Sequence, residues 1–465
     1  MKKWDELIYA YALKNAIEHE GRAMTNSVLS SLFHEGLERD KVKDVIKDIQ
    51  KIVNEVNSKN IEKQKEELEN KEKLISHRPE REGLPDLDNV KGKVIMRFSP
   101  SPSGPMHIGH AATGMPTSLY VKRYSGKFYL RIEDTNPENI DKDAYKMIPE
   151  ESKWLFGNVS EVYCQSDKMK KYYDLAKELI KKSAAYVCTC KSEEHKELLD
   201  DNLACDCRSL NSKEQIKRWE KMLDKKGYKE GQAVLRFKSD LNDPNPALRD
   251  FPLARINLTS HPKQKKKYRV WPLMNLSVTA DDIEFNITHT IRAKDHMDNA
   301  KRQEMIFKIF NKRAPISYFL GRYNFTDMEI SCSKTKALIK KGKYSGWDDI
   351  RLPFIAALRK RGYQPEAFAK MAEQRGLSEV DKVISSRDYF DILDNHNREL
   401  LRDKAKKIEY DFSKMKNYKE YVLLMPDNIK KKIYIADKVK DNEIVFFSGL
   451  GYTKLNKNVF WFAHK

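Results

Sequence analysis

Large apolar residues near the start of the chain recur at the spacing of helices. In each of two sets, neighbouring members are one or three positions apart. The sets are Trp4, Leu7, Ile8 and Tyr11, and then Val42, Val45, Ile46 and Ile49. Residues 58–82 carry dense alternating charge and few large apolar groups, which is typical of a polar helix that runs into a linker. The pattern therefore predicts a helical N-terminal extension with its linker over residues 1–82.

From Val94 onward the pattern is that of alternating strands and helices. Residues 94–98 form a short apolar run, a proline-rich loop follows, and a helix is predicted to open at residues 107–112. A second apolar run occupies residues 129–132. Strand, loop, helix and strand in this order form the unit from which parallel sheets are built. We therefore assign residues 83–160 to the first half of a parallel α/β domain.

The remaining residues divide into four further regions. Residues 161–270 hold a cysteine cluster and lysine-rich patches, and we interpret them as an inserted domain. Strand and helix alternate again over residues 271–340, the second half of the α/β domain. The pattern is helical from Trp347 to Ser385, within a region that we assign to residues 341–400. The last region, 401–465, contains short apolar runs typical of strands, at 421–424, 433–435 and 444–447, so we expect a small β-barrel there.

Composition narrows the functional classes. The 465 residues are 40% hydrophobic and 34% charged, and no run of about 18 apolar residues occurs, which excludes a transmembrane helix. The basic N-terminus lacks the apolar stretch of a secretory signal, so we expect a cytoplasmic protein. The net charge of +19 predicts a polyanionic partner, nucleic acid before an anionic membrane. Lysines that are merely solvated would give the same charge.

The segment RFSPSPSGPMHIGH, from Arg97 to His110, carries the strongest chemical signal. It joins a strand end to the start of a helix, where free backbone N–H groups and the helix dipole favour a phosphate. Gly109 lets a purine or ribose approach the backbone closely. His107 and His110 can donate hydrogen bonds to the extra charge of a pentacoordinate phosphate. Alone, the histidines would indicate a helix start with two surface side chains, but the serine- and proline-rich lead-in makes chance a poor explanation.

The string RFSPSPSGPMHIGHA resembles the first signature of class I aminoacyl-tRNA synthetases, and more closely that of the glutamyl and glutaminyl branch. ISCSKTK at residues 330–336 resembles the second signature, a flexible lysine loop, in the form found in archaeal-type glutamyl-tRNA synthetases. GKYSGWDDIRL at residues 342–352 and YALKNA at residues 11–16 are also similar to the archaeal enzymes. The resemblance covers roughly residues 5–400, and the two signatures fall in the family's order.

This resemblance implies a Rossmann-like, parallel-sheet catalytic domain with an inserted acceptor-binding domain. A helical region that contacts the tRNA stem and a short β-barrel on the anticodon side would follow. The implied activity joins L-glutamate to tRNA-Glu through a glutamyl-adenylate, with release of AMP and diphosphate, and leaves open whether tRNA-Gln is also charged. We expect a monomer whose partners are tRNA, glutamate and ATP, with no membrane association.

The resemblance also implies the residues that handle ATP and its Mg²⁺. His107, His110 and Lys334 would be catalytic, and Gly109 and Ser333 would join them in binding ATP. The role of Lys334 has a physical basis, because a mobile ammonium group on a serine-rich loop can neutralise the departing pyrophosphate. The alternative is an ordinary solvated lysine.

Two arginines indicate which amino acid is bound. Arg97 ends the first predicted strand, at the edge where parallel sheets bind ligands. Arg292 lies in ITHTIRAKDH, which resembles a segment of the glutamyl enzymes, whereas the glutaminyl branch typically has a neutral residue there. A guanidinium group binds a carboxylate through two hydrogen bonds, and glutamine would leave it unpaired at a cost of about 1–3 kcal/mol. Arg292 therefore favours glutamate, and a structural salt bridge with Asp295 or Asp282 is the alternative.

Two further residues are candidates for the amino-acid pocket. Glu133 resembles the acidic residue that receives the substrate's α-ammonium group, although its segment RIEDTNP is also turn-like. Ser99 is the second candidate. Met274 stands where many relatives carry a tyrosine, and Ala293 replaces a common glycine. If that tyrosine normally bonds the substrate, this pocket does without it or uses another group.

Four of the six cysteines form the pattern C-x-C-x14-C-x-C: Cys188, Cys190, Cys205 and Cys207. Four thiolates in two close pairs suit tetrahedral zinc, and related enzymes carry a similar knuckle in the insertion. We therefore predict a structural Zn²⁺ ion. Four free thiols and a redox pair are the alternatives.

Basic patches flank the cysteine cluster, one near the start and one near the end of the inserted domain. They comprise Lys168, Lys170 and Lys171, and then Lys263, Lys265, Lys266, Lys267 and Arg269. Such patches fit phosphate contacts with an acceptor stem. Two rival functions remain at this point, a glutaminyl-tRNA synthetase and a non-catalytic RNA-binding protein of the same fold. The intact histidines and Lys334 argue against the second.

Overall fold

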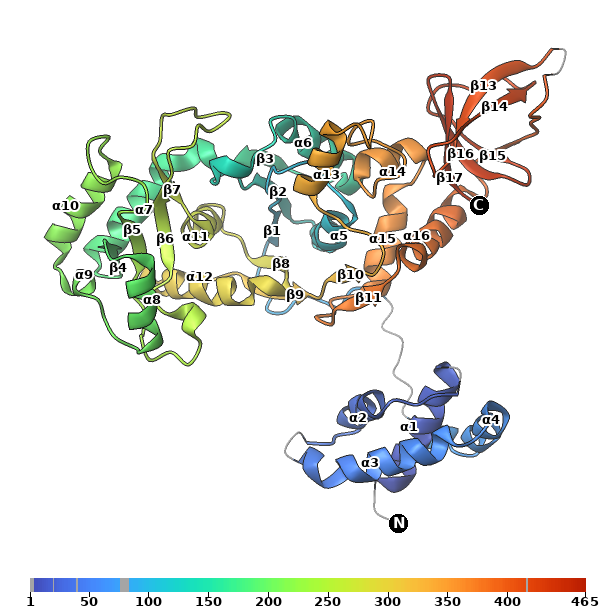
Figure 1. Ribbon diagram of the computed structural model, residues 1–465, viewed down its shortest axis with the longest axis horizontal. Coiled ribbons are helices and arrows are strands. Elements are labelled where there is room, and N and C mark those ends of the chain that lie inside the picture. Colours follow the sequence, from blue (N-terminus) through green and yellow to red (C-terminus); the bar gives the residue numbers. More distant parts are fainter. Residues whose placement is uncertain (1–3, 20, 39–40, 76–82, 415–416) are drawn as a thin grey trace. The chain divides into compact units, whose positions relative to one another are not determined.

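The structure is a computed structural model of the chain, and it describes residues 4–19, 21–38, 41–75, 83–414 and 417–465. The chain forms two compact units, residues 1–81 and 82–465 (Figure 1). Part of the predicted linker, residues 76–82, lies outside the described residues. Basic and acidic side chains are equal in number over residues 1–81, so the whole positive surplus belongs to the second unit. None of the described helices is long and apolar enough to cross a bilayer.

The first unit is helical, as its periodicity predicts. Its elements are α1 (Asp5–Glu18), α2 (Thr25–His34), α3 (Val42–Asn57), α4 (Ile61–Glu69) and the short 3-10 helix η2 (Glu72–Leu74). Both predicted apolar sets, apart from Val42, pack into one core. Helix α4 lies in the charged stretch of residues 58–82. Asn60 caps its N-terminus, because Asn60 Oδ1 accepts a hydrogen bond from Lys63 N at 2.9 Å.

The centre of the second unit is a parallel sheet in two parts. Strands β1 (Ile95–Phe98), β2 (Lys127–Ile132) and β3 (Glu161–Cys164) pair in parallel, and so do β8 (His289–Ala293) and β9 (Ile316–Leu320). Strand β8 lies beside β1, where Thr288 N donates to Ile95 O at 2.9 Å. Both predicted strands are therefore present, and the carboxyl ends of β1 and β8 meet at one edge.

Helices and short 3-10 turns connect these strands and cover the sheet. They are α5 (Ile108–Arg123), η3 (Pro137–Asn139), α6 (Ala144–Phe156), η4 (Gln165–Lys168), α11 (Met274–Glu284), η6 (Lys294–His296), α12 (Met297–Ile309) and α13 (Cys332–Lys340). Apolar residues of β1, β2, α5 and α6 share a core with helices from the later part of the chain. The predicted α/β fold class is confirmed.

The inserted region has a separate core and an antiparallel sheet. Its strands, in sheet order, are β4 (Ala185–Cys188), β5 (Val234–Phe237), β6 (Pro252–Ile256) and β7 (Val270–Pro272). Its helices are α7 (Met169–Lys181), α8 (Ser192–Asp200), α9 (Asp206–Ser209), η5 (Pro246–Leu248) and α10 (Ser212–Leu223). Helices α7 and α10 pack together and against β4 (Figure 1). Apolar residues of α7 and α10, including the fully buried Trp219, close this core.

The region after α13 differs in part from its predicted pattern. It holds α14 (Ile355–Arg361), α15 (Pro365–Arg375), β11 (Lys382–Ile384) and α16 (Ser386–Leu401), and the short strand β10 (Tyr323–Phe325) precedes α13. The helical pattern from Trp347 to Ser385 corresponds to two helices, α14 and α15, with non-helical segments before and after them. Asp349 accepts backbone hydrogen bonds from Ser345 and Arg351, which holds the first part in turns. After α15 ends at Gly376, with a φ of +63°, β11 pairs with β10 instead of continuing the helix.

The last residues form a small barrel, as expected. Its strands, in sheet order, are β12 (Lys406–Ile408), β15 (Ile444–Phe447), β16 (Gly451–Asn456), β17 (Val459–His464), β13 (Lys419–Leu424) and β14 (Lys430–Ile435). A backbone bridge between Asp411 and Tyr434, with N–O distances of 3.0 and 2.8 Å, joins the two edges. Tyr452 and Phe462 are buried here, so they belong to the core and are not free to stack on bases.

Candidate active site

The histidine motif forms the N-terminus of α5. His107 is the N-cap residue, and its Nδ1 accepts a hydrogen bond from Gly109 N at 3.1 Å. His110 Nδ1 accepts from His107 N at 3.3 Å, and the two rings stack with their centroids 3.9 Å apart. A Cβ at Gly109 would lie 3.0 Å from the His107 ring, so a side chain there would crowd it. Glycine thus keeps the ring in place.

These contacts fix the chemical state of both imidazoles. Because each Nδ1 accepts a backbone N–H, each Nε2 carries the ring proton and can donate it to a ligand. Burial lowers the pKa of His110 to about 4, and burial together with the neighbouring His110 lowers the pKa of His107. Both rings are therefore neutral hydrogen-bond donors at neutral pH, which suits contact with phosphate oxygens at a helix N-terminus.

A pocket of about 290 Å³ opens beside this motif, between the carboxyl ends of β1 and β8. Its lining includes all four predicted amino-acid-binding residues, Arg97, Ser99, Glu133 and Arg292, together with His110. Parallel sheets bind ligands at this edge, where neighbouring strands diverge. The structure therefore brings one histidine of the motif and the candidate amino-acid contacts into one site.

Arg292 is the cation in this pocket without a carboxylate partner. It is 7% exposed, and its Nη1 donates to Gln303 Oε1 at 2.9 Å. Among the described residues, no carboxylate lies within ion-pair distance. Asp295 pairs with Arg322 and Asp282 with Arg97 and Arg131, so the alternative of a structural salt bridge is not seen. Burial, followed by repulsion from Arg97, lowers the pKa of Arg292 to about 9, which still leaves it charged at neutral pH.

Arg97 also lies in the pocket, but it is already paired. Its Nε and Nη2 each lie 3.3 Å from an oxygen of Asp282, and both side chains are buried. This fork fixes the guanidinium group and neutralises much of its charge. Arg292 is therefore the better candidate to select an anionic side chain, and Arg97 adds a second donor.

Buried charges that were not predicted from the sequence lie beneath the pocket. Arg131 is fully buried, and its Nη1 lies 2.7 Å from Asp282 Oδ1 while its Nη2 lies 3.1 Å from Glu133 Oε1. Asp281 and Asp282 are adjacent on α11, and both are buried. The available signal was the spacing of two residues: Arg131 lies in β2 and Glu133 directly follows its last residue, so an extended backbone puts both side chains on the same side. The pairing of Arg131 with Asp282, about 150 positions later in the chain, has no such local signal.

The apolar wall of the pocket contains both departures from the relatives. Met274 and Ala293 both line the pocket, and neither side chain carries a hydroxyl group that could replace that of the tyrosine. Ser99 Oγ is buried and has no hydrogen-bond partner among the described residues. An unpaired buried hydroxyl group is rare in a folded protein. It therefore marks Ser99 as a polar contact available to a ligand.

The structure places Lys334 differently from the prediction of a mobile loop. Lys334 lies in the first turn of α13, where Ser331 Oγ accepts from its backbone nitrogen at 3.4 Å. Its side chain is 67% exposed, and its Nζ pairs with Glu329. Ser333 lies in the same turn, one residue before Lys334, and is exposed. Cys332 Sγ packs 3.8 Å from Pro105 O, which brings this turn against the loop that leads to the histidines.

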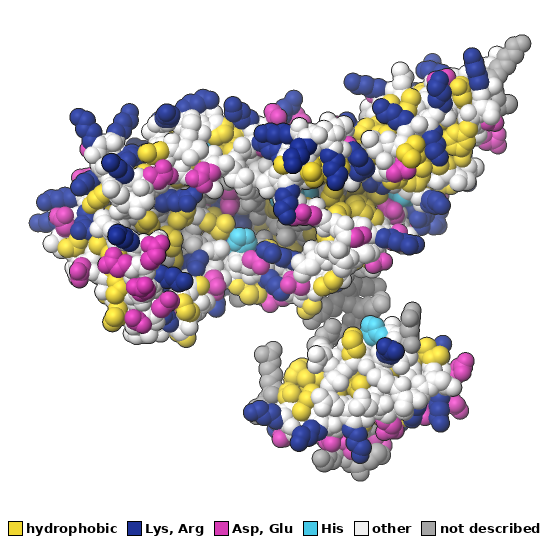
Figure 2. All heavy atoms as spheres, in the orientation of Figure 1, with side chains coloured by type: hydrophobic (Ala, Val, Ile, Leu, Met, Phe, Trp, Pro, Cys, Tyr) yellow, Lys and Arg dark blue, Asp and Glu magenta, His cyan; other side chains and the backbone are white. Residues whose placement is uncertain are grey.

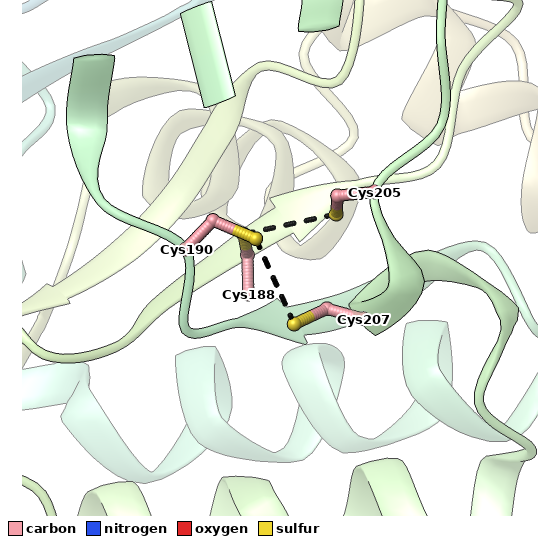
Figure 3. A group of neighbouring side chains, drawn as sticks. All are labelled: Cys188, Cys190, Cys205 and Cys207. Atoms are coloured by element: carbon pink, nitrogen blue, oxygen red, sulfur yellow. Dashed lines mark hydrogen bonds between the residues drawn. The ribbon is translucent and has the colours of Figure 1, made fainter. Parts of the chain in front are cut away.

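The four clustered cysteines meet at one point beside β4, as predicted (Figure 3). All four sulfurs lie within 4.8 Å of one another, with Cys188–Cys205 at 3.9 Å and Cys190–Cys207 at 4.0 Å. A tetrahedron with Zn–S bonds of about 2.3 Å has edges of about 3.8 Å. The donor set therefore fits a zinc ion.

The surroundings of Cys205 and Cys207 favour thiolates, whereas the hydrogen bond with Cys205 raises the pKa of Cys188 and burial raises that of Cys190. Arg218 Nη1 donates to Cys207 Sγ at 3.3 Å, and Thr189 N donates to the same sulfur at 3.5 Å. A hydrogen bond from Cys188 lowers the pKa of Cys205 to about 5. Cations and donors aimed at sulfur stabilise the deprotonated ligands that a metal needs.

The basic patches are partly engaged within the protein. Lys168 and Lys171 pair with Glu284, and Lys263 pairs with Asp167. Lys265 and Lys266 are exposed and have no ion pair among the described residues. Lysine and arginine side chains are scattered over the visible surface of the second unit, among acidic and hydrophobic ones (Figure 2). Fewer lysines are therefore free for phosphate contacts than the sequence indicates.

Glu151 supports the histidine loop from α6 and should make stability depend on pH. Its buried Oε2 accepts from Met106 N at 2.6 Å, and burial raises its pKa to about 8 from 4.5. The native state therefore holds the proton to higher pH, and stability falls as pH rises from 4.5 towards 8, by about 1.4 kcal/mol per pKa unit at most. Glu151→Gln should thus raise the melting temperature at about pH 8.5 but not at about pH 5. An equal difference at both pH values would contradict this.

The chain matches known proteins over most of its length. Residues 93–401 match the family model described as tRNA synthetases class I (E and Q), catalytic domain. Glutamate--tRNA ligases of Methanothermobacter thermautotrophicus and Methanocaldococcus jannaschii are each 40% identical, over 87% of this chain and 72% of the relative. That of Thermococcus onnurineus is 42% identical, over 82% of this chain and 68% of the relative.

Among solved structures, a glutamate tRNA ligase from Elizabethkingia meningosepticum, in complex with its amino acid, aligns with a TM-score of 0.46 and 18% identity. The alignment covers 67% of this chain and 70% of that one. The family model and the archaeal relatives confirm the resemblance found in the sequence. The chain belongs to the class I tRNA synthetases of the glutamate and glutamine family.

Proposed function

We propose that this chain ligates L-glutamate to tRNA-Glu in two steps, through a glutamyl-adenylate. The observation that carries the proposal is Arg292, a buried guanidinium group that lines the pocket without a carboxylate partner among the described residues. An anionic side chain supplies the missing charge, whereas glutamine leaves the guanidinium unpaired. The names of the archaeal relatives support glutamate as well.

In the first step, the α-carboxylate of glutamate attacks the α-phosphate of ATP, which enters with its Mg²⁺. Glu133 receives the α-ammonium group of the amino acid, and Arg292 with Arg97 holds the side-chain carboxylate. His107 and His110 donate their Nε2 protons to oxygens of the α-phosphate, whose charge grows in the transition state. Gly109 and Ser333 contact the nucleotide, and Lys334 exchanges its surface pair with Glu329 for the departing diphosphate.

In the second step, a terminal ribose hydroxyl group of tRNA attacks the activated carbonyl and releases AMP. The inserted domain is the proposed contact for the acceptor end, through the exposed Lys265 and Lys266 among others. The barrel after residue 400 is proposed to face the anticodon side. Salt dependence of tRNA binding should follow the number of phosphates neutralised.

The four cysteines are proposed to hold a structural Zn²⁺ ion. Protein prepared under reducing conditions without chelator should contain about one zinc per chain and lose it in Cys205→Ser. Removal of the metal should lower the melting temperature of the inserted domain. Cys164→Ser is the matched control, because Cys164 lies outside the cluster and should retain the ion. Fresh protein without zinc by elemental analysis would contradict the assignment.

Pyrophosphate exchange tests the proposed reaction. Exchange into ATP should depend on glutamate and not on glutamine, in reactions that also contain tRNA. Charging assays with tRNA-Glu and tRNA-Gln then define the RNA range. Exchange with glutamine in preference to glutamate would favour the glutaminyl alternative. No exchange under any condition would indicate a non-catalytic protein.

A further inference from the structure

A series of buried polar contacts connects the inserted domain to Glu133. Tyr172, on α7, donates from its Oη to Asp281 Oδ1 at 2.9 Å. Gln165, on η4, donates from Nε2 to Asp281 Oδ2, also at 2.9 Å. Asp281 in turn lies 3.8 Å from Arg131 Nη1, and Arg131 Nη2 holds Glu133 Oε1 at 3.1 Å.

Three members of this series are shielded from solvent, so water cannot replace their contacts. Arg131 and Tyr172 are fully buried, and Asp281 is 1% exposed. None of the three lines the pocket. A buried guanidinium group must be matched by carboxylates at close range, because removal of either partner leaves an uncompensated charge. The position of Arg131 therefore depends on all the carboxylates around it.

Three carboxylates share this one guanidinium group. Asp282 lies 2.7 Å from Arg131 Nη1, and Glu133 contacts Nη2. Asp281 is the third carboxylate and lies farther away. Burial raises the pKa of Asp281 to about 6, while the hydrogen bonds from Gln165 and Tyr172 oppose this rise. Weaker hydrogen bonds to Asp281 would leave Arg131 more strongly drawn to Glu133.

We propose that Asp281 and Arg131 are positioning residues through which Tyr172 of the inserted region, together with Gln165 on η4, sets the strength with which Glu133 binds glutamate. This rests on the proposed function and adds its regulation. Glu133 divides its charge between Arg131 and the α-ammonium group of the substrate. A ligand that shifts η4 or α7 reaches the amino-acid pocket through the same contacts.

Tyr172→Phe tests the proposal with little change in volume. It should raise the KM for glutamate about three- to tenfold in pyrophosphate exchange and leave kcat and the KM for ATP within about twofold. Tyr173→Phe is the matched control. Tyr173 is the next residue on α7 and donates to Val270 O at 2.6 Å, inside the inserted region, so its loss should leave the glutamate KM unchanged.

A double-mutant cycle separates positioning from a general loss of order. Glu133→Gln removes the carboxylate on which Tyr172 is proposed to act. In this background, adding Tyr172→Phe should change the glutamate KM by less than about twofold. Effects that multiply in the double variant, or equal effects of Tyr172→Phe and Tyr173→Phe, would overturn the proposal. Wild-type protein without glutamate-dependent exchange would overturn the proposed function as well. Normal wild-type exchange with an unaltered Tyr172→Phe would overturn the positioning role alone.

Discussion

Replacement of Arg292 with glutamine is expected to lower kcat/KM for glutamate by about 10²- to 10³-fold, mainly through KM. Loss of one partner from a buried, hydrogen-bonded charge pair costs about 2–5 kcal/mol. The side-chain carboxylate lies away from the reacting atoms, so kcat should fall less than affinity. Pyrophosphate exchange at varied glutamate and glutamine concentrations measures both effects, and the ratio of the two activities should shift towards glutamine.

Stability distinguishes this loss from unfolding. The lowered pKa of Arg292 means that its charge destabilises the unliganded native state at neutral pH, because the unfolded state binds that proton more tightly. Arg292→Gln should therefore melt no earlier than wild type. Arg292→Lys is the second control, since an ammonium group keeps the charge but cannot form the fork, and its effect should be intermediate. An unchanged KM for glutamate in Arg292→Gln would remove the assigned role.

Lys334→Met is expected to lower kcat for adenylate formation by about 10²- to 10³-fold, with little change in the KM for glutamate. The ammonium group acts on charge that develops as diphosphate departs, so its contribution appears in the transition state. Its ground-state pair with Glu329 is exposed and therefore weak. Single-turnover formation of the adenylate measures the step directly.

Two comparisons make the Lys334 result specific. Lys340 lies on the same helix, is also exposed and has no ion pair among the described residues, so Lys340→Met should leave the rate within about twofold. Transfer of glutamate from preformed adenylate to tRNA should be unaffected in Lys334→Met, since diphosphate has already left. Equal loss in both steps would indicate a disturbed fold and not a role in diphosphate departure.

Local sequence signals were sufficient for the elements that hold the site. The apolar run before Phe98 and the histidines at the helix start are adjacent in sequence, so their strand, loop and helix could be predicted. The four cysteines lie in two close pairs, and the antiparallel pairing of β4 with β5 leaves Cys188 at a strand end. In both cases the chemistry depends on residues that are near one another along the chain.

The features that could not be predicted from the sequence depend on contacts that form only in the folded structure. Asp282 meets Arg131 and Arg97 across more than 150 positions, and each residue taken alone resembles a surface charge. The mobile loop predicted for Lys334 became a helical turn because Ser331 caps it. β11 is short and gains its order from pairing with β10. A three-residue strand has no periodicity that a sequence pattern could reveal.

A structure of the protein with a sulfamoyl analogue of glutamyl-adenylate tests the central claim most directly. We predict that the side-chain carboxylate of the analogue lies within about 3 Å of an Arg292 Nη atom. We also expect the His110 Nε2 atom at hydrogen-bond distance from the sulfamoyl group. A side-chain carboxylate bound away from Arg292, or an analogue bound outside the crevice between β1 and β8, would contradict the account.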